Sequence, residues 1–474
     1  MDMNRKTDTI AAIATAMSDS GIGIVRVSGK EAISVVDKIY RNRKQERSLT
    51  KYFSHTIHYG YLTEEDGTVI DEVMVSVMKA PKSYTTEDIV EINCHGGILM
   101  MKKILETVIK AGARTAEPGE FTKRAFLNGR IDLSEAEAVM DLIQAKNTFA
   151  LESSVKQLKG SVSRQIRSLR EEILYEIAFI ESALDDPEHI SLEGYHNRLS
   201  VKTDMMIETL TKLINSADDG KILKEGIYTV IVGKPNAGKS SLLNLLVGEE
   251  KAIVTDVAGT TRDLLEEKIS LGGMTLNMID TAGIRSTEDL VEKIGVEKAK
   301  KISEEADLIL YVVDSSLPLD ENDRDILRLI QNKNTIILLN KSDLQEVVTE
   351  QDIMEEIKGV SNGNSFDSFV KMIRTSTKND SGIDTLTGLI REMFFNGKIS
   401  YNDEVYITNM RHKEAIEDAL ESMRQVDKSL SFHMPEDFYS IDLMGAYTAL
   451  GKILGEEVED DLVNEIFSKF CMGK

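Results

Sequence analysis

Apolar residues follow three patterns along the chain. In the first 130 residues, β-branched runs at 23–28, 71–78 and 89–93 predict strands within a mixed α and β region. From 151 to 184, apolar residues recur at steps of three and four, which predicts one long amphipathic helix that stops at Asp186-Pro187. A second helix is expected over roughly 201–217.

The pattern changes again after residue 226. Apolar runs at 228–232, 275–279, 308–313 and 335–339 are each followed by a polar loop and helical spacing. This alternation is typical of a doubly wound, largely parallel sheet. After residue 398 the spacing is helical to the end.

These patterns predict an α+β multidomain protein. We expect an N-terminal α/β domain at 1–128, a discontinuous helical domain at 129–225 and 398–474, and an α/β domain inserted at 226–397. Ser134 followed by Glu137 predicts a capping box where the first helical segment begins. The 474 residues suit about three domains at the usual ~100–200 residues per domain.

Composition excludes several classes of protein. With 41% apolar residues each domain can bury a core, and no run reaches the ~18 apolar residues of a membrane span. The first residues lack the apolar stretch of a signal peptide, and two cysteines cannot build a disulfide framework. We therefore expect a cytoplasmic protein that does not enter a membrane.

Charge is distributed unevenly. The chain carries a net charge of −23, but residues 1–129 are near neutral at +1, residues 226–397 hold −10 and the remainder holds −14. An anionic ligand is best tolerated in the N-terminal part, and an acidic chain is a poor binder of nucleic acid by itself.

Residues 233–240, Gly-Lys-Pro-Asn-Ala-Gly-Lys-Ser, match the P-loop pattern between a predicted strand and a predicted helix over 241–247. Backbone N–H groups of such a loop surround phosphate oxygens, and the helix N-terminus favours negative charge. Lys239 is expected to bridge the β- and γ-phosphates, and the Ser240 hydroxyl to bind Mg²⁺.

Two later stretches are candidate switch loops. Residues 280–283, Asp-Thr-Ala-Gly, end a predicted strand, and Thr261 can supply the second hydroxyl on Mg²⁺. The next residue, Ile284, cannot orient water as glutamine does in many small GTPases. Hydrolysis must then use Arg285, Glu288, Asp289 or Glu292, or a bound cation.

A third stretch predicts which base is bound. Residues 340–343 are Asn-Lys-Ser-Asp, and the Asp343 carboxylate can accept from N1–H and the amine of guanine, whereas adenine would leave it unpaired. Asn340 can tie this loop to the P-loop. Ser376, Thr377 and Lys378 follow another apolar run, and a backbone N–H there can reach guanine O6. The nucleotide is therefore GTP.

The whole chain resembles the tRNA-modification GTPase family called MnmE or TrmE. The stretches that carry the resemblance, besides the GTPase motifs, are 21–29, Tyr84-Thr85-Thr86-Glu87-Asp88, His95-Gly96-Gly97, 118–130, and the terminus Phe470-Cys471-Met472-Gly473-Lys474. The resemblance implies a folate-binding, dimerising N-terminal domain and a Ras-like G domain inserted in the helical one. It also implies a homodimer and a flavoprotein partner, MnmG or GidA. Together they would modify C5 of the wobble uridine, position 34, of certain tRNAs, with a 5-formyl- or methylene-tetrahydrofolate as one-carbon source.

The resemblance also implies a role for K⁺ in hydrolysis. The positions that match the family's potassium ligands are Asn236, Thr255, Val257 and Thr260, and Glu292 matches its catalytic carboxylate. A monovalent cation beside the phosphates can replace the charge of an arginine finger. The full set expected to contact GTP is Asn236, Ala237, Gly238, Lys239, Ser240, Ser241, Thr255, Asp256, Val257, Ala258, Gly259, Thr260, Thr261, Asp280, Thr281, Ala282, Gly283, Asn340, Lys341, Ser342, Asp343, Ser376, Thr377 and Lys378.

Folate contacts implied by the resemblance fall on Arg26, Glu91, Arg130 and Lys474. A carboxylate suits the donor edge of a pterin ring, and basic groups suit the anionic tail. Cys471 is either an unreactive thiol of the tail or a residue with a chemical role. The chain departs from the family at 16–20, where a Pro-Pro-Gly stretch is common, at Thr377 in place of alanine, and at Met472.

Two other functions remain as alternatives at this point. One is a GTP-switch assembly factor that binds ribosomal RNA, which would be expected to carry a basic RNA-binding module such as a KH-type loop. None is found, and the C-terminal region is acidic. The other is a folate-dependent transferase with a regulatory G domain, which no flavin or pyridoxal motif supports.

Overall fold

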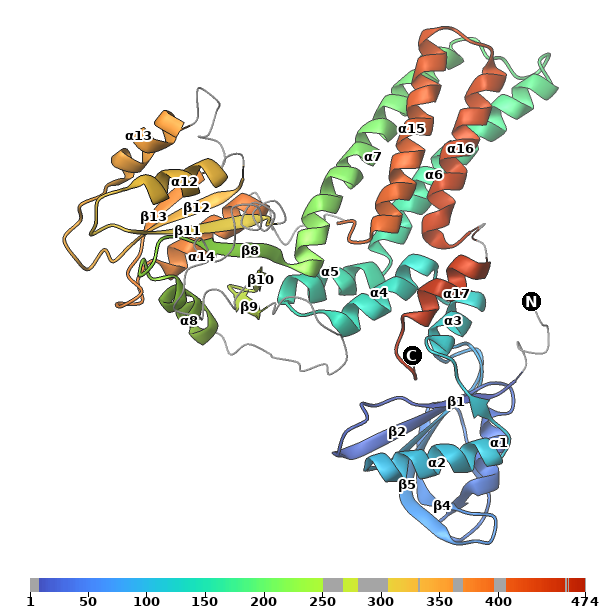
Figure 1. Ribbon diagram of the computed structural model, residues 1–474. Coiled ribbons are helices and arrows are strands. Elements are labelled where there is room, and N and C mark those ends of the chain that lie inside the picture. The colour runs from blue at the N-terminus through green and yellow to red at the C-terminus, as the bar shows by residue number, and fades with distance from the viewer. Residues whose placement is uncertain are drawn as a thin grey trace. The chain divides into compact units, whose positions relative to one another are not determined.

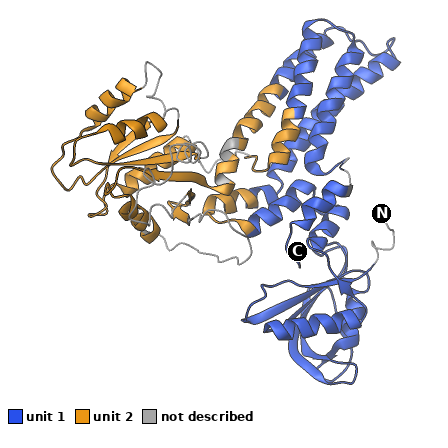
Figure 2. Cartoon of the chain, in the orientation of Figure 1, with its two compact units in different colours: residues 1–143, 155–206, 418–474 blue, residues 144–154, 207–417 orange. Residues whose placement is uncertain are grey.

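The computed structural model describes residues 8–249, 267–279, 306–330, 333–360, 370–395, 406–456, 458 and 460–473. The chain forms two compact units, coloured in Figure 2: residues 1–143, 155–206 and 418–474, and residues 144–154 and 207–417. Each unit contains one β-sheet together with helices (Figure 1). The predicted α+β class is confirmed.

The sheet of the first unit has seven strands in the order β3-β4-β5-β6-β2-β1-β7. The strands are β1 (Ile10–Ile13), β2 (Ser20–Ser28), β3 (Tyr40–Asn42), β4 (Thr56–Thr63), β5 (Val69–Met78), β6 (Ile89–Gly96) and β7 (Arg114–Thr115). Neighbours are antiparallel except β1 and β7, which are parallel. The three strands predicted here are confirmed as β2, β5 and β6, and each is longer than expected.

One face of this sheet is covered by α1 (Ala32–Ile39) and α2 (Ile98–Lys110). Alternate strand residues such as Ile92 are fully buried against Ile104 of α2. The intervening residues lie on the opposite face because side chains alternate along a strand. Glu91 and Arg26, paired across β6 and β2, are on that second face, which remains partly accessible.

Helices make up the rest of the first unit. They are the short 3-10 helix η2 (Leu49–Lys51), α3 (Glu120–Leu127), α6 (Ser161–Asp185), α16 (Glu436–Leu454) and α17 (Asp460–Ser468). Four more helices contribute residues to both units: α4 (Leu133–Gln144), α5 (Thr148–Leu158), α7 (Tyr195–Glu225) and α15 (Met410–Ser431). The helical character predicted after residue 398 is confirmed for the described residues from Met410 onward.

The prediction of one long helix over 151–184 is wrong, because the structure has two helices separated near Gly160. Gly160 has a φ of 78°, a left-handed conformation that glycine adopts without a steric penalty. The apolar stripe itself was correctly placed. Ile166, Ile173 and Ile180 are all buried along α6.

The predicted capping box at Ser134 and Glu137 is also wrong, by two residues. The Asp132 carboxylate accepts from the Glu135 N–H at 3.0 Å, and the Glu135 carboxylate accepts from the Asp132 N–H at 3.0 Å. Ser134 is already inside α4, where its hydroxyl bonds to Asp132. The reciprocal pattern is the one expected of a capping box, with aspartate instead of serine as the cap.

The sheet of the second unit has six strands in the order β13-β12-β11-β8-β10-β9. They are β8 (Ile227–Val232), β9 (Glu267–Leu271), β10 (Met274–Met278), β11 (Leu308–Asp314), β12 (Thr335–Asn340) and β13 (Val370–Arg374). All pairs are parallel except β9 with β10. The largely parallel sheet is therefore confirmed, and β9 is an antiparallel edge strand that the sequence did not reveal.

Helices cover both faces of this second sheet. They are α8 (Lys239–Glu249), α12 (Glu321–Leu329), α13 (Glu350–Val360) and α14 (Ile383–Phe395). Leu246 of α8 and Leu386 of α14 pack into one core, while Leu327 of α12 and Ile353 of α13 pack into another. Two cores on opposite faces of one parallel sheet define a doubly wound α/β fold.

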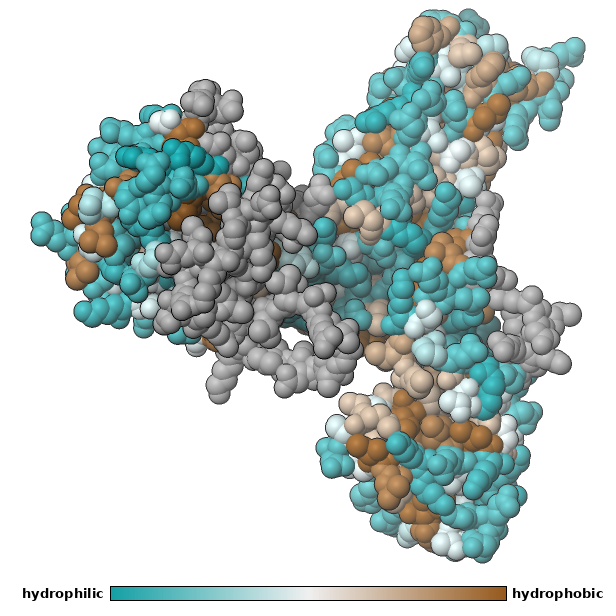
Figure 3. Space-filling model, in the orientation of Figure 1, coloured by the Kyte–Doolittle hydropathy of each residue, from teal (hydrophilic) through white to brown (hydrophobic). Residues whose placement is uncertain are grey.

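In the described residues, no helix is both long and apolar enough to cross a membrane. Figure 3 shows a mostly hydrophilic surface on the visible face, interrupted by apolar side chains on the helices and on the N-terminal part.

Candidate functional site

The first candidate site lies at one edge of the second sheet. β8, β11, β12 and β13 run parallel, so the loops that follow them meet where these strands end. Three of these loops contain residues 233–238, 340–343 and 375–378, which the sequence predicts to bind a nucleotide. Ligands bind at this edge in open α/β sheets, because helix N-termini and loop side chains converge there.

The P-loop leads from β8 into α8. Gly233 has a φ of 151°, and a Cβ at that position would clash with the Val312 carbonyl oxygen. The ammonium of Lys239 donates to the Gly233 and Lys234 carbonyl oxygens, at 2.7 Å each, and so lies across the loop. Asn236, at the tip, has a φ of 59° and an exposed side chain.

Asn340 connects the base loop to the P-loop, as predicted. Its side chain is fully buried, and its Nδ2 donates to the Ala237 carbonyl oxygen at 2.8 Å. Its Oδ1 accepts from the Thr377 N–H at 3.2 Å. A Cβ at Gly238 would clash with the same amide group, so glycine is required where the two loops touch. One buried amide thus holds together three segments that are distant in sequence.

Asp343 presents its carboxylate beside residues 376–378. The Ser376 hydroxyl donates to Asp343 Oδ1 at 2.7 Å, and the Lys378 ammonium is 3.9 Å from Oδ2. The Ser376 hydrogen bond lowers the pKa of Asp343 below its usual value. The carboxylate is an acceptor at neutral pH, and the Ser376 hydrogen bond extends its ionised form to lower pH. Thr377 stands where alanine is usual in the family that the chain resembles, and its hydroxyl lies 3.5 Å from Asn340 Nδ2.

Two supporting ion pairs were missed from the sequence. Lys341 pairs with Asp314 at 2.5 Å, and Lys234 of the P-loop pairs with the buried Asp323 at 2.6 Å. Lys341, which has a φ of 62°, is held by this contact in a conformation that is uncommon outside glycine. Asp314 is the last residue of the buried strand β11, which ends at the same edge, and its position after the apolar run 308–313 is the signal that could have indicated it.

Many predicted residues lie outside the described part of the chain. They are Thr255, Asp256, Val257, Ala258, Gly259, Thr260, Thr261, Asp280, Thr281, Ala282, Gly283, Ile284, Arg285, Glu288, Asp289, Glu292 and Lys474.

A second candidate site lies in the first unit, on the accessible face of its sheet. Arg26 Nε and Nη2 each lie 2.8 Å from Glu91 Oε1, and Arg26 Nη1 donates to the Gly473 carbonyl oxygen at 2.8 Å. The C-terminal tail therefore reaches the two residues predicted to bind folate. Within the described residues no hydrogen bond engages Glu91 Oε2, so this oxygen can accept from a ligand.

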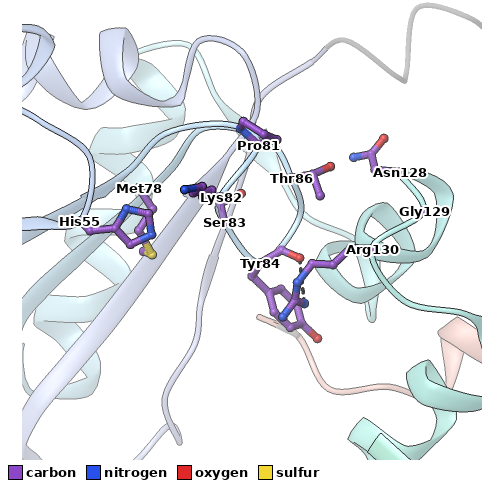
Figure 4. Close-up of a pocket in the computed structure, with 10 residues that line it drawn as sticks. All are labelled: His55, Met78, Pro81, Lys82, Ser83, Tyr84, Thr86, Asn128, Gly129 and Arg130. Atoms are coloured by element: carbon purple, nitrogen blue, oxygen red, sulfur yellow. Dashed lines mark hydrogen bonds between the residues drawn. The ribbon is translucent and has the colours of Figure 1, made fainter. Parts of the chain in front are cut away.

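Tyr84 joins the third predicted residue, Arg130, to this pair. The centroid of its ring is 5.7 Å from the Arg26 guanidinium carbon and 4.8 Å from that of Arg130. Arg130 Nη1 also donates to the Tyr84 carbonyl oxygen at 3.1 Å, as the dashed line in Figure 4 shows. In the sequence, Tyr84 stands out only as part of the stretch 84–88, and its position near two arginines could not be predicted.

An open hollow of about 530 Å³, here called the loop hollow, lies beside Arg130 (Figure 4). Its lining residues are His55, Met78, Pro81, Lys82, Ser83, Tyr84, Thr86, Asn128, Gly129 and Arg130.

The two cysteines have different environments. Cys94 is buried, its Sγ lies 3.3 Å from the Gly23 carbonyl oxygen, and burial raises the pKa of its thiol to about 11. Such a thiol is unreactive. Cys471 is exposed, and its carbonyl oxygen accepts from the Gly119 N–H at 3.4 Å, which ties the tail to the start of α3.

Two protein families match this chain. Residues 9–130 match the family described as the GTP-binding protein TrmE N-terminus, and residues 133–471 match the MnmE helical domain.

Three relatives bear the description tRNA modification GTPase MnmE. The protein from Lachnoclostridium phytofermentans is 56% identical, over 99% of this chain and 100% of that protein. Those from Acetivibrio thermocellus and Streptococcus gordonii are 48% and 46% identical, over 99% and 100% of this chain and all of each relative. Because the similarity extends over nearly the whole chain, the protein belongs to the MnmE family of tRNA modification GTPases.

Proposed function

We propose that this GTPase is activated by potassium and works with a flavoprotein of the MnmG (GidA) type. Together they would install a one-carbon-derived, aminomethyl-type group on C5 of the wobble uridine, position 34, of certain tRNAs. The observation that carries the nucleotide part is the buried Asn340 amide, which holds the P-loop beside the Asp343 carboxylate. Membership of the MnmE family carries the tRNA part and argues against the assembly-factor alternative.

Guanine recognition follows from the acceptor at Asp343. One carboxylate can accept from both N1–H and the exocyclic amine of guanine, whereas adenine carries an acceptor at N1. A site built around a polar pair discriminates strongly, because the wrong base leaves a carboxylate unpaired. Ser376 supports this role by donating to Oδ1, which favours the ionised form of the carboxyl.

The phosphate groups would be bound by the P-loop. Lys239 is already directed across the loop, and the N-terminus of α8 starts at this residue. Helix N-termini attract anions through their free N–H groups and dipole. We expect the Lys239 ammonium to bind the β- and γ-phosphates, and the hydroxyls of Ser240 and Thr261 to bind Mg²⁺.

The proposed potassium site includes Asn236. Its side chain is exposed at the tip of the P-loop, and in the described part of the chain no hydrogen bond engages its amide. An amide oxygen is a suitable ligand for a hard monovalent cation. Thr255, Val257 and Thr260 would complete the site, and a cation there stabilises charge that develops on the phosphates.

Glu292 is the proposed general base. Its position matches the catalytic carboxylate of the family that the chain resembles, and a carboxylate can accept a proton from the attacking water, which Ile284 cannot do.

The folate proposal rests on the donor and acceptor pattern around Glu91. Its Oε1 is held by Arg26, while Oε2 remains available for the N–H and amine donors of a pterin ring. Glu91 and Arg26 are only 22% and 16% exposed, so a ligand there would be partly shielded from water. A bound tetrahydrofolate would supply the one-carbon unit. This chain would bind and orient it through Arg26, Glu91, Arg130 and Lys474.

The proposed homodimer uses the N-terminal domain. Large apolar side chains are exposed on the accessible face of its sheet, among them Ile22, Ile57 and Met74, which are 56%, 68% and 46% exposed. Apolar surface of this kind favours association with a partner.

The proposed domains are 1–128 for folate and dimerisation, 129–225 with 398–474 for the helical domain, and 226–397 for the G domain. The net charge of −23 leads us to assign most of the tRNA binding to the flavoprotein.

GTP turnover in matched potassium and sodium salts tests the proposal. We expect turnover to be severalfold faster in potassium, and Asn236→Ala to remove that difference while GTP binding persists. Equal rates of GTP turnover by the parent protein in both salts would contradict the proposed role of potassium in hydrolysis. The guanine assignment is tested separately with Asp343→Asn, which should transfer preference from guanine to xanthine nucleotides. Unchanged GTP affinity would contradict it.

A further inference from the structure

The loop hollow has more positive character than the rest of this acidic chain. Lys82 and Arg130 both line it, and none of its lining residues is an aspartate or glutamate. Neither cation forms an ion pair within the described residues. A hollow with two unpaired cations and no acid favours an anionic ligand.

The acids of the surrounding loop are occupied elsewhere. Glu87 binds Arg124, whose guanidinium is only 8% exposed, and it also accepts from the Ser28 hydroxyl at 2.8 Å. Asp88 accepts from the Ala80 N–H at 2.8 Å. These contacts direct the Glu87 carboxylate toward Arg124 and hold the Asp88 carboxylate at the Ala80 N–H.

Backbone strain marks the same place. Thr86 and His55 both line the hollow and have φ values of 62° and 63°. A positive φ is especially unfavourable for a β-branched residue such as threonine. Asn236 and Lys341, in the nucleotide site, have the same kind of conformation. In addition, no hydrogen bond engages the Thr86 hydroxyl among the described residues, so it can donate to a ligand. Strained residues gather at binding sites because the fold holds them there for the ligand.

The hollow adjoins the proposed folate site through one aromatic ring. The guanidinium carbons of Arg26 and Arg130 lie 5.7 Å and 4.8 Å from the centroid of the Tyr84 ring, and both Tyr84 and Arg130 line the hollow. A ligand that places its ring against Glu91 and Arg26 would therefore direct its opposite end toward Arg130 and Lys82. In a folate, that opposite end is the glutamate tail.

We propose that the loop hollow binds the γ-linked oligoglutamate chain of a polyglutamylated tetrahydrofolate, with Lys82 and Arg130 as its carboxylate-binding cations. This inference rests on the proposed folate site. The ligand is a flexible chain with one carboxylate per residue, which suits two separated cations and a free hydroxyl in an open hollow. RNA phosphate is the less favoured ligand. Binding of an RNA strand requires a longer row of basic residues than the two cations of this hollow, because the chain as a whole carries a net charge of −23.

Binding of two folates to the full-length protein tests the inference. Tetrahydrofolate with one glutamate and tetrahydrofolate with five would be titrated calorimetrically. We expect the pentaglutamate to bind about tenfold more tightly, which corresponds to about 1.4 kcal/mol. The ratio of the two affinities, pentaglutamate over monoglutamate, should decrease as salt increases, because exposed ion pairs are screened.

Lys82→Gln should reduce the ratio, and Lys82→Glu should bring it to about one. Lys110→Glu makes the same charge change at the exposed end of α2, outside the hollow, and should leave the ratio as in the parent protein. Both folates binding the parent protein equally would overturn the inference and leave the folate site standing. No binding of either folate would overturn both. If Lys82→Glu weakens tRNA retention but leaves the glutamate dependence intact, the hollow binds RNA phosphate and the inference is wrong.

Discussion

Replacing Asn340 with alanine should loosen the nucleotide site without touching a phosphate or the base. The side chain is fully buried and makes two well-formed hydrogen bonds, to the Ala237 carbonyl oxygen and from the Thr377 N–H. Alanine leaves both backbone groups without a partner, and each buried orphan costs about 1–3 kcal/mol. GTP binding then has to bring the loops together again, and part of this free-energy cost reduces the affinity for GTP.

If about 2 kcal/mol of it falls on binding, GTP affinity decreases about 30-fold. Equilibrium binding of a fluorescent GTP analogue measures this loss. Hydrogen exchange of the Thr377 amide provides a local readout, because this N–H loses its acceptor and should exchange faster. Asn322→Ala is a matched control, since Asn322 is an exposed residue of α12. Unchanged affinity together with unchanged exchange at Thr377 would refute the claim that Asn340 holds these loops together.

Two further predictions concern recognition and hydrolysis. The Ser376 hydroxyl lowers the pKa of Asp343, so the charged acceptor persists above the usual pKa and is lost only as pH decreases through the lowered value. Ser376→Ala should therefore move the acid loss of GTP affinity to higher pH in a titration from about pH 6 to about pH 2.5, a range that includes the usual pKa of aspartate, and an unmoved midpoint would contradict this role. Glu292→Ala should retain GTP binding but reduce turnover by about 10²–10⁴-fold in a phosphate-release assay, whereas Glu288→Ala should remain active. Undiminished turnover in Glu292→Ala would show that another group positions the water.

Much of the second unit could be predicted because its signals are local. Four apolar runs predicted β8, β10, β11 and β12, and three of these strands, β8, β10 and β12, are followed within a few residues by a nucleotide-binding motif. The Asn340 contact with the P-loop was also foreseen, because parallel strands bring their following loops to one edge. Asp314 was overlooked because one carboxylate at a strand end carries no motif.

The folate-side geometry was much less predictable. Arg26 meets the Gly473 carbonyl across 447 residues, and no periodicity encodes such a contact. The helix break at Gly160 and the cap at Asp132 were misjudged for a different reason. The apolar repeat predicts a continuous helix through Gly160, but the left-handed backbone of this glycine separates two helices. The sequence pattern predicts a cap at Ser134, but the Asp132 carboxylate caps the helix instead.

We propose that this chain acts in wobble-uridine modification through GTP. Mass analysis of wobble nucleosides from cells that lack the protein tests it most directly. We expect C5-modified uridines to disappear from position 34, the intact chain to restore them, and the Asp343→Asn variant not to restore them. A normal profile of modified uridines in the cells without the protein would contradict it.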